Sequence, residues 1–148
     1  MKKNLVKMAL VMISSLFFLA GNAAAHCEIP CGIYDDETRV KLMLEDLTTI
    51  EKSINEIKKI EETKDHDANQ LVRWVMNKEH HADLLQEIVS QYWLTQRIKP
   101  DTKDYDKKLQ SLHQLLVATM KCKQTTDLAN VDKARGLVKE FEALYFAK

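Results

Sequence analysis

Two of the three cysteines in the chain lie in one short segment, His26-Cys27-Glu28-Ile29-Pro30-Cys31-Gly32-Ile33-Tyr34. Cysteine thiolates and histidine nitrogens are common ligands of transition metals. The segment directly follows Ala23-Ala24-Ala25, which satisfies the small-x-small rule for signal peptidase. Cleavage at that point makes His26 the N-terminal residue and adds its α-amine to the available donors. We therefore predict a metal site at the N-terminus of the mature chain.

Residues 1–25 have the organisation of a secretory signal peptide. Lys2, Lys3 and Lys7 form a basic start, and an apolar run follows from Met8 to Ala20. This run is shorter than the roughly 20 residues that a membrane-spanning helix requires, although a retained membrane anchor is the alternative interpretation. We predict that residues 1–25 are removed and that the mature protein is periplasmic or secreted, without a membrane attachment.

The donors at the predicted N-terminus can surround a single metal ion. The α-amine of His26, the amide nitrogen of Cys27 and the Cys27 thiolate can close fused five-membered chelate rings. Pro30 and Gly32 let the chain bend, so that the sulfur of Cys31 completes a square plane and the imidazole of His26 can approach along the axis. Such a donor set favours nickel or copper, with nickel the better fit, whereas zinc requires four tetrahedral side-chain ligands. A Cys27–Cys31 disulfide is the alternative in a secreted protein.

Composition limits the other possibilities. The chain has 148 residues, 45% of them hydrophobic and 30% charged, which suits one globular domain. The three lysines are the only charges before His26, which leaves 22 − 3 = 19 basic side chains against 22 acidic ones, a net charge of −3. This balance offers no basic patch, so we predict no nucleic-acid partner.

Residues 35–148 are predicted to be almost entirely helical, because they contain one proline, Pro100, and one glycine, Gly136. Apolar residues recur there at spacings of three and four in four successive segments. We expect a first helix from a cap at Asp35 or Asp36 to about Glu62 and a polar loop up to Asn69. A second helix, whose apolar set begins at Leu71, should end before Pro100. A third, marked by apolar residues from Tyr105, should stop near Lys123, and a fourth should follow the capping residues of 124–127. The predicted seam of the third helix is Tyr105, Leu109, Leu112, Leu116 and Met120. The prediction is an all-α, up-down-up-down four-helix bundle behind an irregular hook at residues 26–34.

The pattern His26-Cys27-x-x-Pro30-Cys31-Gly32-x-Tyr34 at a processed N-terminus, followed by helices of this length, resembles the nickel superoxide dismutases. The resemblance implies an antioxidant oxidoreductase that converts superoxide to dioxygen and hydrogen peroxide by redox cycling of one nickel ion per subunit. It also implies a homohexamer of four-helix bundles. The implied ligands are the amine and imidazole of His26, the amide and thiolate of Cys27, and the thiolate of Cys31, while Tyr34 guards the approach to the metal.

Behind the hook the chain departs from the family pattern. Family members have an acid on the first helix that holds the axial imidazole. When the chain is aligned with them after Tyr34, that position is Lys41 or Leu42, so Glu37 or Glu45 is the candidate for the role. His81 stands where the family uses an arginine.

Three further groups of residues have ordinary structural interpretations. We interpret His80-His81 as a solvated or interface helix face and Cys122 as a packed or free thiol. The chain has more large aromatic residues than the buried seam of one bundle requires, so we expect some of them between subunits: Trp74, Trp93, Tyr145 and Phe146. Two other functions stay open: a secreted non-catalytic metal-binding or metal-delivery helical module, and a helical interaction protein stapled by a disulfide.

Overall fold

The computed structural model describes residues 7–8, 30, 32–64 and 67–147. The chain divides into two units, Met1–Tyr34 and Asp35–Lys148. In the second unit, every regular element among the described residues is helical: α2 (Asp36–Glu62), α3 (Ala68–Glu87), η1 (Ile88–Arg97), α4 (Tyr105–Gln124) and α5 (Leu128–Phe146). No helix in the described ranges has both the length and the apolar character needed to cross a membrane.

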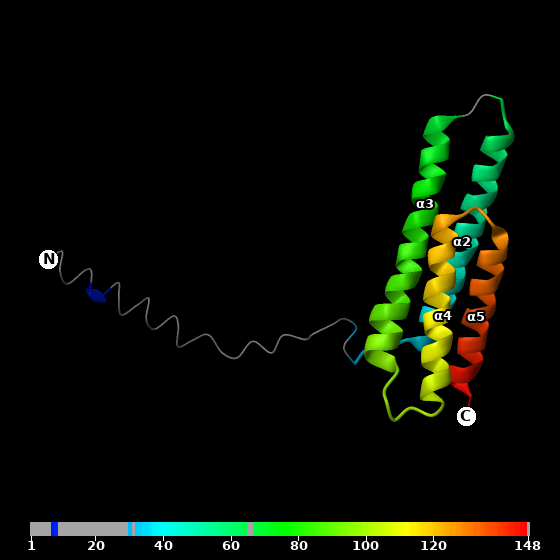
Figure 1. Cartoon of the computed structure of the whole chain (residues 1–148). Helices are drawn as coiled ribbons and strands as arrows, with labels where there is room; N and C mark the ends of the chain where they lie inside the picture. The colour runs from blue at the N-terminus through cyan, green and yellow to red at the C-terminus, as the bar shows by residue number, and fades with distance from the viewer. Residues whose placement is uncertain (1–6, 9–29, 31, 65–66, 148) are drawn as a thin grey trace. The chain divides into compact units, whose positions relative to one another are not determined.

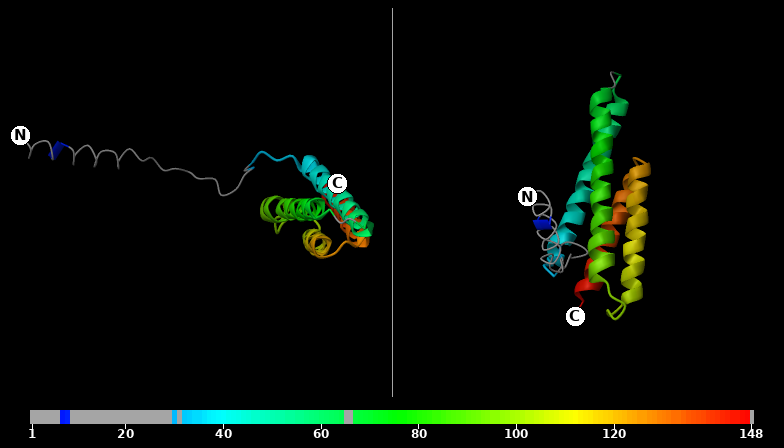
Figure 2. Two further views of the ribbon diagram at one scale, coloured as in Figure 1. Left: turned by 90° about the horizontal axis from the view of Figure 1, so that it is seen from above. Right: turned by 90° about the vertical axis from the view of Figure 1, so that its left-hand side faces the viewer.

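The helices form an antiparallel bundle in which each one packs against the next along the chain. α2 contacts α3 and α5, and α4 contacts α3 and α5, so α5 closes the bundle against α2. Figures 1 and 2 show this arrangement, with α2 and α3 extending beyond α4 and α5 at one end. The predicted all-α, up-down-up-down four-helix bundle is confirmed.

Aspartates start three of the helices. Asp35, Asp67 and Asp127 precede α2, α3 and α5, and each carboxylate accepts a hydrogen bond from a backbone N–H of the first turn. Such N-caps satisfy donors that have no partner within the helix. In the last turn of α4, the carbonyl of Cys122 accepts a hydrogen bond from the ammonium group of the buried Lys78 over 2.9 Å. Side chains thus fix the starts of α2, α3 and α5 and the last turn of α4.

The core is a continuous apolar seam between the four helices. Its largest fully buried side chains are Trp93, Phe141, Met43, Leu47, Ile50, Ile54, Leu85, Leu112 and Leu115. Trp93 therefore belongs to the interior of the bundle, and the expectation that some aromatic residues lie between subunits does not apply to it. Its ring meets Phe141 and Tyr145 edge-on at centroid distances of 4.8 Å.

The seam of α4 differs from the predicted one. Leu112 is buried as expected, but Leu116 is only half-buried and Met120 is 42% exposed. Ser111 and Thr119 take the buried positions, and their hydroxyl groups donate to the carbonyls of Leu137 and Leu115. A prediction from the spacing of apolar side chains alone misses buried positions that small polar residues occupy.

The last ten residues of the second helical segment, η1, wind as a π-helix, whereas the sequence predicts a plain helix up to Pro100. Side chains in η1 bond to backbone carbonyls of the same segment: Thr95 to Ser90 over 2.7 Å, and Gln96 to Gln91 over 3.1 Å. Each bond joins residues five apart, the repeat of a π-helix. Polar side chains that capture backbone groups in this way compete with the α-helical pattern.

Candidate metal centre

The predicted nickel ligands His26, Cys27 and Cys31 lie outside the described residues, so their roles stay predictions. The described part of the hook consists of Pro30, Gly32, Ile33 and Tyr34. The N–H of Ile33 donates to the carbonyl of Pro30 over 3.0 Å, which is the hydrogen bond that closes a four-residue turn. The two ends of this turn, Pro30 and Ile33, flank the segment in which we predict a bend.

Gly32 is the residue that this turn requires. Its φ is +81°, in the region that side-chain-bearing residues avoid and that the third position of a type II turn occupies. No atom lies within 4 Å of the place where a Cβ would stand, so the constraint is the backbone conformation rather than crowding. The glycine of the motif thus has a local structural reason, independent of any metal.

Tyr34 follows the turn and is 39% exposed. It lies two residues before α2, at the end of the first unit. Its predicted guarding of the approach to a metal is not tested by the described residues.

Asp36, the first residue of α2, is the centre of a network that links three helical elements. Arg97 at the end of η1 donates from Nε to Oδ1 over 2.8 Å and from Nη2 to Oδ2 over 2.6 Å. The hydroxyl groups of Tyr92 and Tyr145 donate to the two oxygens over 2.6 and 2.9 Å. We call these four residues the Asp36 cluster. From the sequence, Asp36 is expected only as an alternative cap, a role that Asp35 performs.

The electrostatics of the Asp36 cluster follow from its burial and hydrogen bonds. Burial alone favours a higher pKa for Asp36, but the bonds from Arg97, Tyr92 and Tyr145 outweigh it and hold the pKa below its usual value. Burial and the neighbouring carboxylate raise the pKa of Tyr92 and of Tyr145 to about 12. At neutral pH the cluster therefore consists of one carboxylate, one guanidinium and two neutral phenols.

A second polar pair joins α2 to α3. Nδ1 of His81 lies 2.8 Å from Oδ1 of Asp46, whose side chain is 9% exposed. Burial raises the pKa of Asp46, although the hydrogen bond with His81 acts in the opposite direction. A carboxylate in this position fixes the orientation of an imidazole.

This pair corrects one interpretation from the sequence. Of the two histidines interpreted as a solvated or interface face, His80 is exposed, but His81 is half-buried and bonded to an acid. That acid, Asp46, was not named. It stands next to Glu45 in the sequence, but on the buried side of α2.

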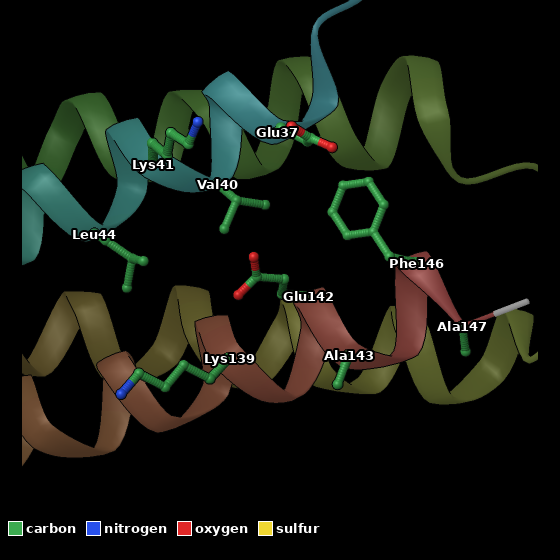
Figure 3. Close-up of a pocket in the computed structure, with 9 residues that line it drawn as sticks. All are labelled: Glu37, Val40, Lys41, Leu44, Lys139, Glu142, Ala143, Phe146 and Ala147. Carbon is green, nitrogen blue, oxygen red and sulfur yellow. The ribbon is translucent and has the colours of Figure 1, made fainter.

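The candidate residues for holding the axial imidazole, and those that replace the family's acid, lie mainly on the surface of α2. Glu37, Lys41 and Glu45 are exposed, and Leu42 is 36% exposed. Glu37 and Lys41 line a groove between α2 and α5, in which Phe146 comes from α5 (Figure 3). The groove brings acidic and basic side chains together, and no ligand that would bind a soft metal lines it.

The described residues contain no group of three or more histidine, cysteine, aspartate or glutamate side chains that could hold a metal ion. Cys122 is a free, fully buried thiol, as expected for a packed residue. Burial raises its pKa to about 11, so it stays protonated and is a poor ligand at neutral pH. Cys122 is therefore not a candidate thiolate ligand, and the predicted ones, Cys27 and Cys31, lie outside the described residues.

The bundle, with a turn-forming cysteine segment before its first helix, defines a small helical protein with a candidate metal centre at its N-terminus. Residues 21–148 match the family described as nickel-containing superoxide dismutase. The chain belongs to this family, whose name denotes nickel-dependent oxidoreductases.

Two curated relatives agree with this assignment. The chain is similar to "Superoxide dismutase [Ni]" of Streptomyces coelicolor, with 26% identity over 139 residues that cover 91% of this chain and 96% of the relative. It is also similar to "Superoxide dismutase [Ni]" of Streptomyces seoulensis, with 22% identity over 135 residues and the same coverage. No solved structure matches it.

Proposed function

We propose that the mature chain dismutates superoxide to dioxygen and hydrogen peroxide with one nickel ion per subunit held by residues 26–31. The observation that carries this proposal is the donor set His26, Cys27 and Cys31 in a chain that belongs to the nickel-containing superoxide dismutases. The bend formed between Pro30 and Ile33 supports it, because the second thiolate has to fold back toward the first.

The donors fit nickel on chemical grounds. Two thiolates are soft donors and a deprotonated amide adds a third anionic donor, and such a set suits a borderline-soft metal with a square-planar preference. The bound ion supplies a one-electron couple that oxidises one superoxide and reduces the next. In the proposed site, the anionic donors of Cys27 and Cys31 favour the oxidised state, and the His26 imidazole adds a further nitrogen donor to it. Tyr34 occupies the approach from solvent.

The site requires a mature chain that begins at His26, because only then is the α-amine available. We infer that residues 1–25 are a signal peptide, that the enzyme works in the periplasm or outside the cell, and that it assembles as a homohexamer. Mass spectrometry of the native protein tests the first inference: a mature chain that starts at any other residue lacks the amine ligand.

The function is tested by measuring nickel content and superoxide decay on one preparation of mature protein. Cys27→Ser and Cys31→Ser should each abolish stoichiometric nickel, since a neutral hydroxyl cannot replace an anionic soft donor. Cys122→Ser is the matched control, and it should keep its nickel. Stoichiometric nickel without turnover would identify a metal-binding module instead, and a Cys27–Cys31 disulfide without metal would identify a stapled interaction protein.

A further inference from the structure

The Asp36 cluster lies where the proposed metal-binding segment joins the bundle. Asp36 is the first residue of α2, and Tyr34 precedes it by two residues in the chain. Its partners come from distant parts of the sequence: Tyr92 and Arg97 from η1, and Tyr145 from the end of α5. The start of α2 is therefore tied to two other elements by side chains that all meet on one carboxylate.

The cluster is well enclosed for a group of charged residues. The side chains of Asp36 and Arg97 are 16% and 24% exposed. The guanidinium of Arg39 lies 4.8 Å from the centre of the Tyr92 ring, so a second cation supports the phenol that bonds to Asp36. Charge-assisted, bidentate bonds of this kind fix geometry as well as adding energy.

Lys108 adds the remaining helix to the arrangement. This residue of α4 is 5% exposed, and its ammonium group lies 5.4 Å from the centre of the Tyr145 ring. All four helical segments of the bundle thus contribute a side chain to the cluster or its immediate surroundings. A cap for one helix needs only a single side chain, which Asp35 already supplies through its bond to the N–H of Thr38.

The π-helical winding of η1 is what allows two of the partners to reach Asp36 together. Tyr92 and Arg97 are five residues apart, and in an α-helix this spacing turns their side chains about 140° away from each other. In a π-helix, whose backbone bonds join residues five apart, the two side chains lie on the same side of the helix. Segments of this kind are rare and often occur at functional sites.

We propose that Asp36 and Arg97 are positioning residues that fix the start of α2, and hence the point from which residues 26–34 extend, so that the metal environment at the N-terminus is uniform. This inference rests on the proposed function. In this proposal neither residue is a ligand of the metal, and each acts through the backbone between Asp36 and the hook. A small displacement of a reacting group is enough to reduce a rate about a hundredfold.

The test compares Asp36→Asn and Arg97→Gln with Glu51→Gln. Glu51 accepts from Arg135 over 2.5 Å, so this pair also joins α2 to α5, but farther along α2. The control removes a carboxylate from the same helix as Asp36 and leaves the start of α2 intact. Tyr92→Phe/Tyr145→Phe serves as a second variant that keeps the ion pair and removes only the two phenol bonds.

Two readouts are needed, one of them on metal-free protein. In metal-free protein, hydrogen exchange at the amides of Thr38 and Arg39, which bond to Asp35, should accelerate about tenfold or more in Asp36→Asn and Arg97→Gln. In nickel-loaded protein, both variants should keep the metal, give a broadened electron paramagnetic resonance spectrum of oxidised nickel, and dismutate superoxide about ten- to a hundredfold more slowly. Glu51→Gln should match the parent in every readout.

The outcomes separate this inference from the proposed function. A parent protein without nickel or turnover refutes the proposed function, while the exchange measurement still decides whether the cluster holds the start of α2. Parental exchange rates in Asp36→Asn and Arg97→Gln would overturn the positioning role. So would a parental nickel spectrum and rate in a folded variant, because the cluster would then contribute stability only. If Asp36→Asn does not fold, the double phenylalanine variant must show the same changes to a smaller degree.

Discussion

Asp35 and Asp36 are adjacent acids with different roles at the start of α2. Both are acids at the start of a predicted helix, and local rules identify a cap there without choosing between them. The structure gives Asp35 the cap and Asp36 the network with Arg97 and Tyr145. The cap depends on a residue three positions away, so the sequence can predict it, whereas the partners of Asp36 are 61 and 109 residues away.

Replacement of His26 separates nickel binding from turnover. In His26→Ala the new N-terminal residue still has an α-amine, provided that the signal peptide is cleaved, so the amine, the amide and both thiolates survive and nickel should stay bound. The imidazole is lost, and superoxide decay should slow by orders of magnitude, each tenfold loss corresponding to about 1.4 kcal/mol of barrier. Nickel analysis and pulse radiolysis on a preparation of confirmed N-terminus measure both quantities. A variant that keeps nickel and the parental rate would contradict the role of the imidazole.

The titration of Asp36 predicts how stability depends on pH in acid. Its pKa is lowered in the folded state, so its stabilising contribution is complete above the usual value of about 4 and is lost as the pH falls through the lower folded-state value. The free energy of unfolding of the parent should exceed that of Asp36→Asn by a constant amount near neutral pH. Below about pH 4 the two should converge. Urea unfolding at several pH values tests this, and a gap that persists at low pH would show that ionisation is not the cause.

The two phenols of the cluster predict the alkaline behaviour. The pKa values of Tyr92 and Tyr145 are raised to about 12, above the reference of 10.0, so their contribution is complete below pH 10 and is lost as the pH rises through about 12. Burial is the larger cause, and the Asp36 carboxylate is the second. In Asp36→Asn both pKa values should therefore fall but stay above 10.0. Phenolate absorbance followed as the pH is raised measures the shift.

At the scale of elements, periodicity predicted the helices well and their detailed winding poorly. The first helix was expected from Asp35 or Asp36 to about Glu62, and α2 runs from Asp36 to Glu62. The π-helix η1 was not predicted, because an apolar stripe with Val89, Tyr92 and Trp93 is compatible with either winding. Whether a segment widens depends on which backbone carbonyls its polar side chains capture, and that is decided during tertiary packing.

A change of length in η1 tests the argument about winding. Deletion of Thr95 brings Tyr92 and Arg97 to a spacing of four, which in an α-helix again places them on one face. Insertion of an alanine after Thr95 gives a spacing of six, which separates them in either kind of helix. The insertion should therefore lower Tm more than the deletion and should accelerate hydrogen exchange at Thr38. Equal effects of the two changes would contradict the claim that η1 serves to place Tyr92 and Arg97 on the same side of the helix.

At the scale of the whole molecule, the bundle could be predicted because its signal is distributed over the chain. Four apolar stripes and the near absence of glycine and proline identify the fold even where single seam positions are wrong, as with Met120 on α4. The pairing of His81 with Asp46 could not be found in this way, because it depends on which faces of α2 and α3 meet. The motif at residues 26–34 is local, so the sequence alone indicated a metal and an enzyme family.

The last helix predicts a long-range effect of truncation. Tyr145 packs against Trp93 and donates to Asp36, so the end of the described chain supports the start of α2. A chain that ends after Leu144 loses this bond and the buried ring, which should cost about 2–4 kcal/mol and lower Tm by about 10 °C or more. A chain that ends after Phe146 is the matched control, because it keeps Tyr145 and its contact with Phe146. Thermal unfolding followed by circular dichroism gives the stability, and hydrogen exchange at Thr38 shows whether the loss reaches α2.

If the shorter chain loses stability but Thr38 exchanges at the parental rate, Tyr145 stabilises the core without holding the start of α2. Faster exchange at Thr38 in the shorter chain alone would show that the start of α2 and the end of α5 are coupled through one carboxylate.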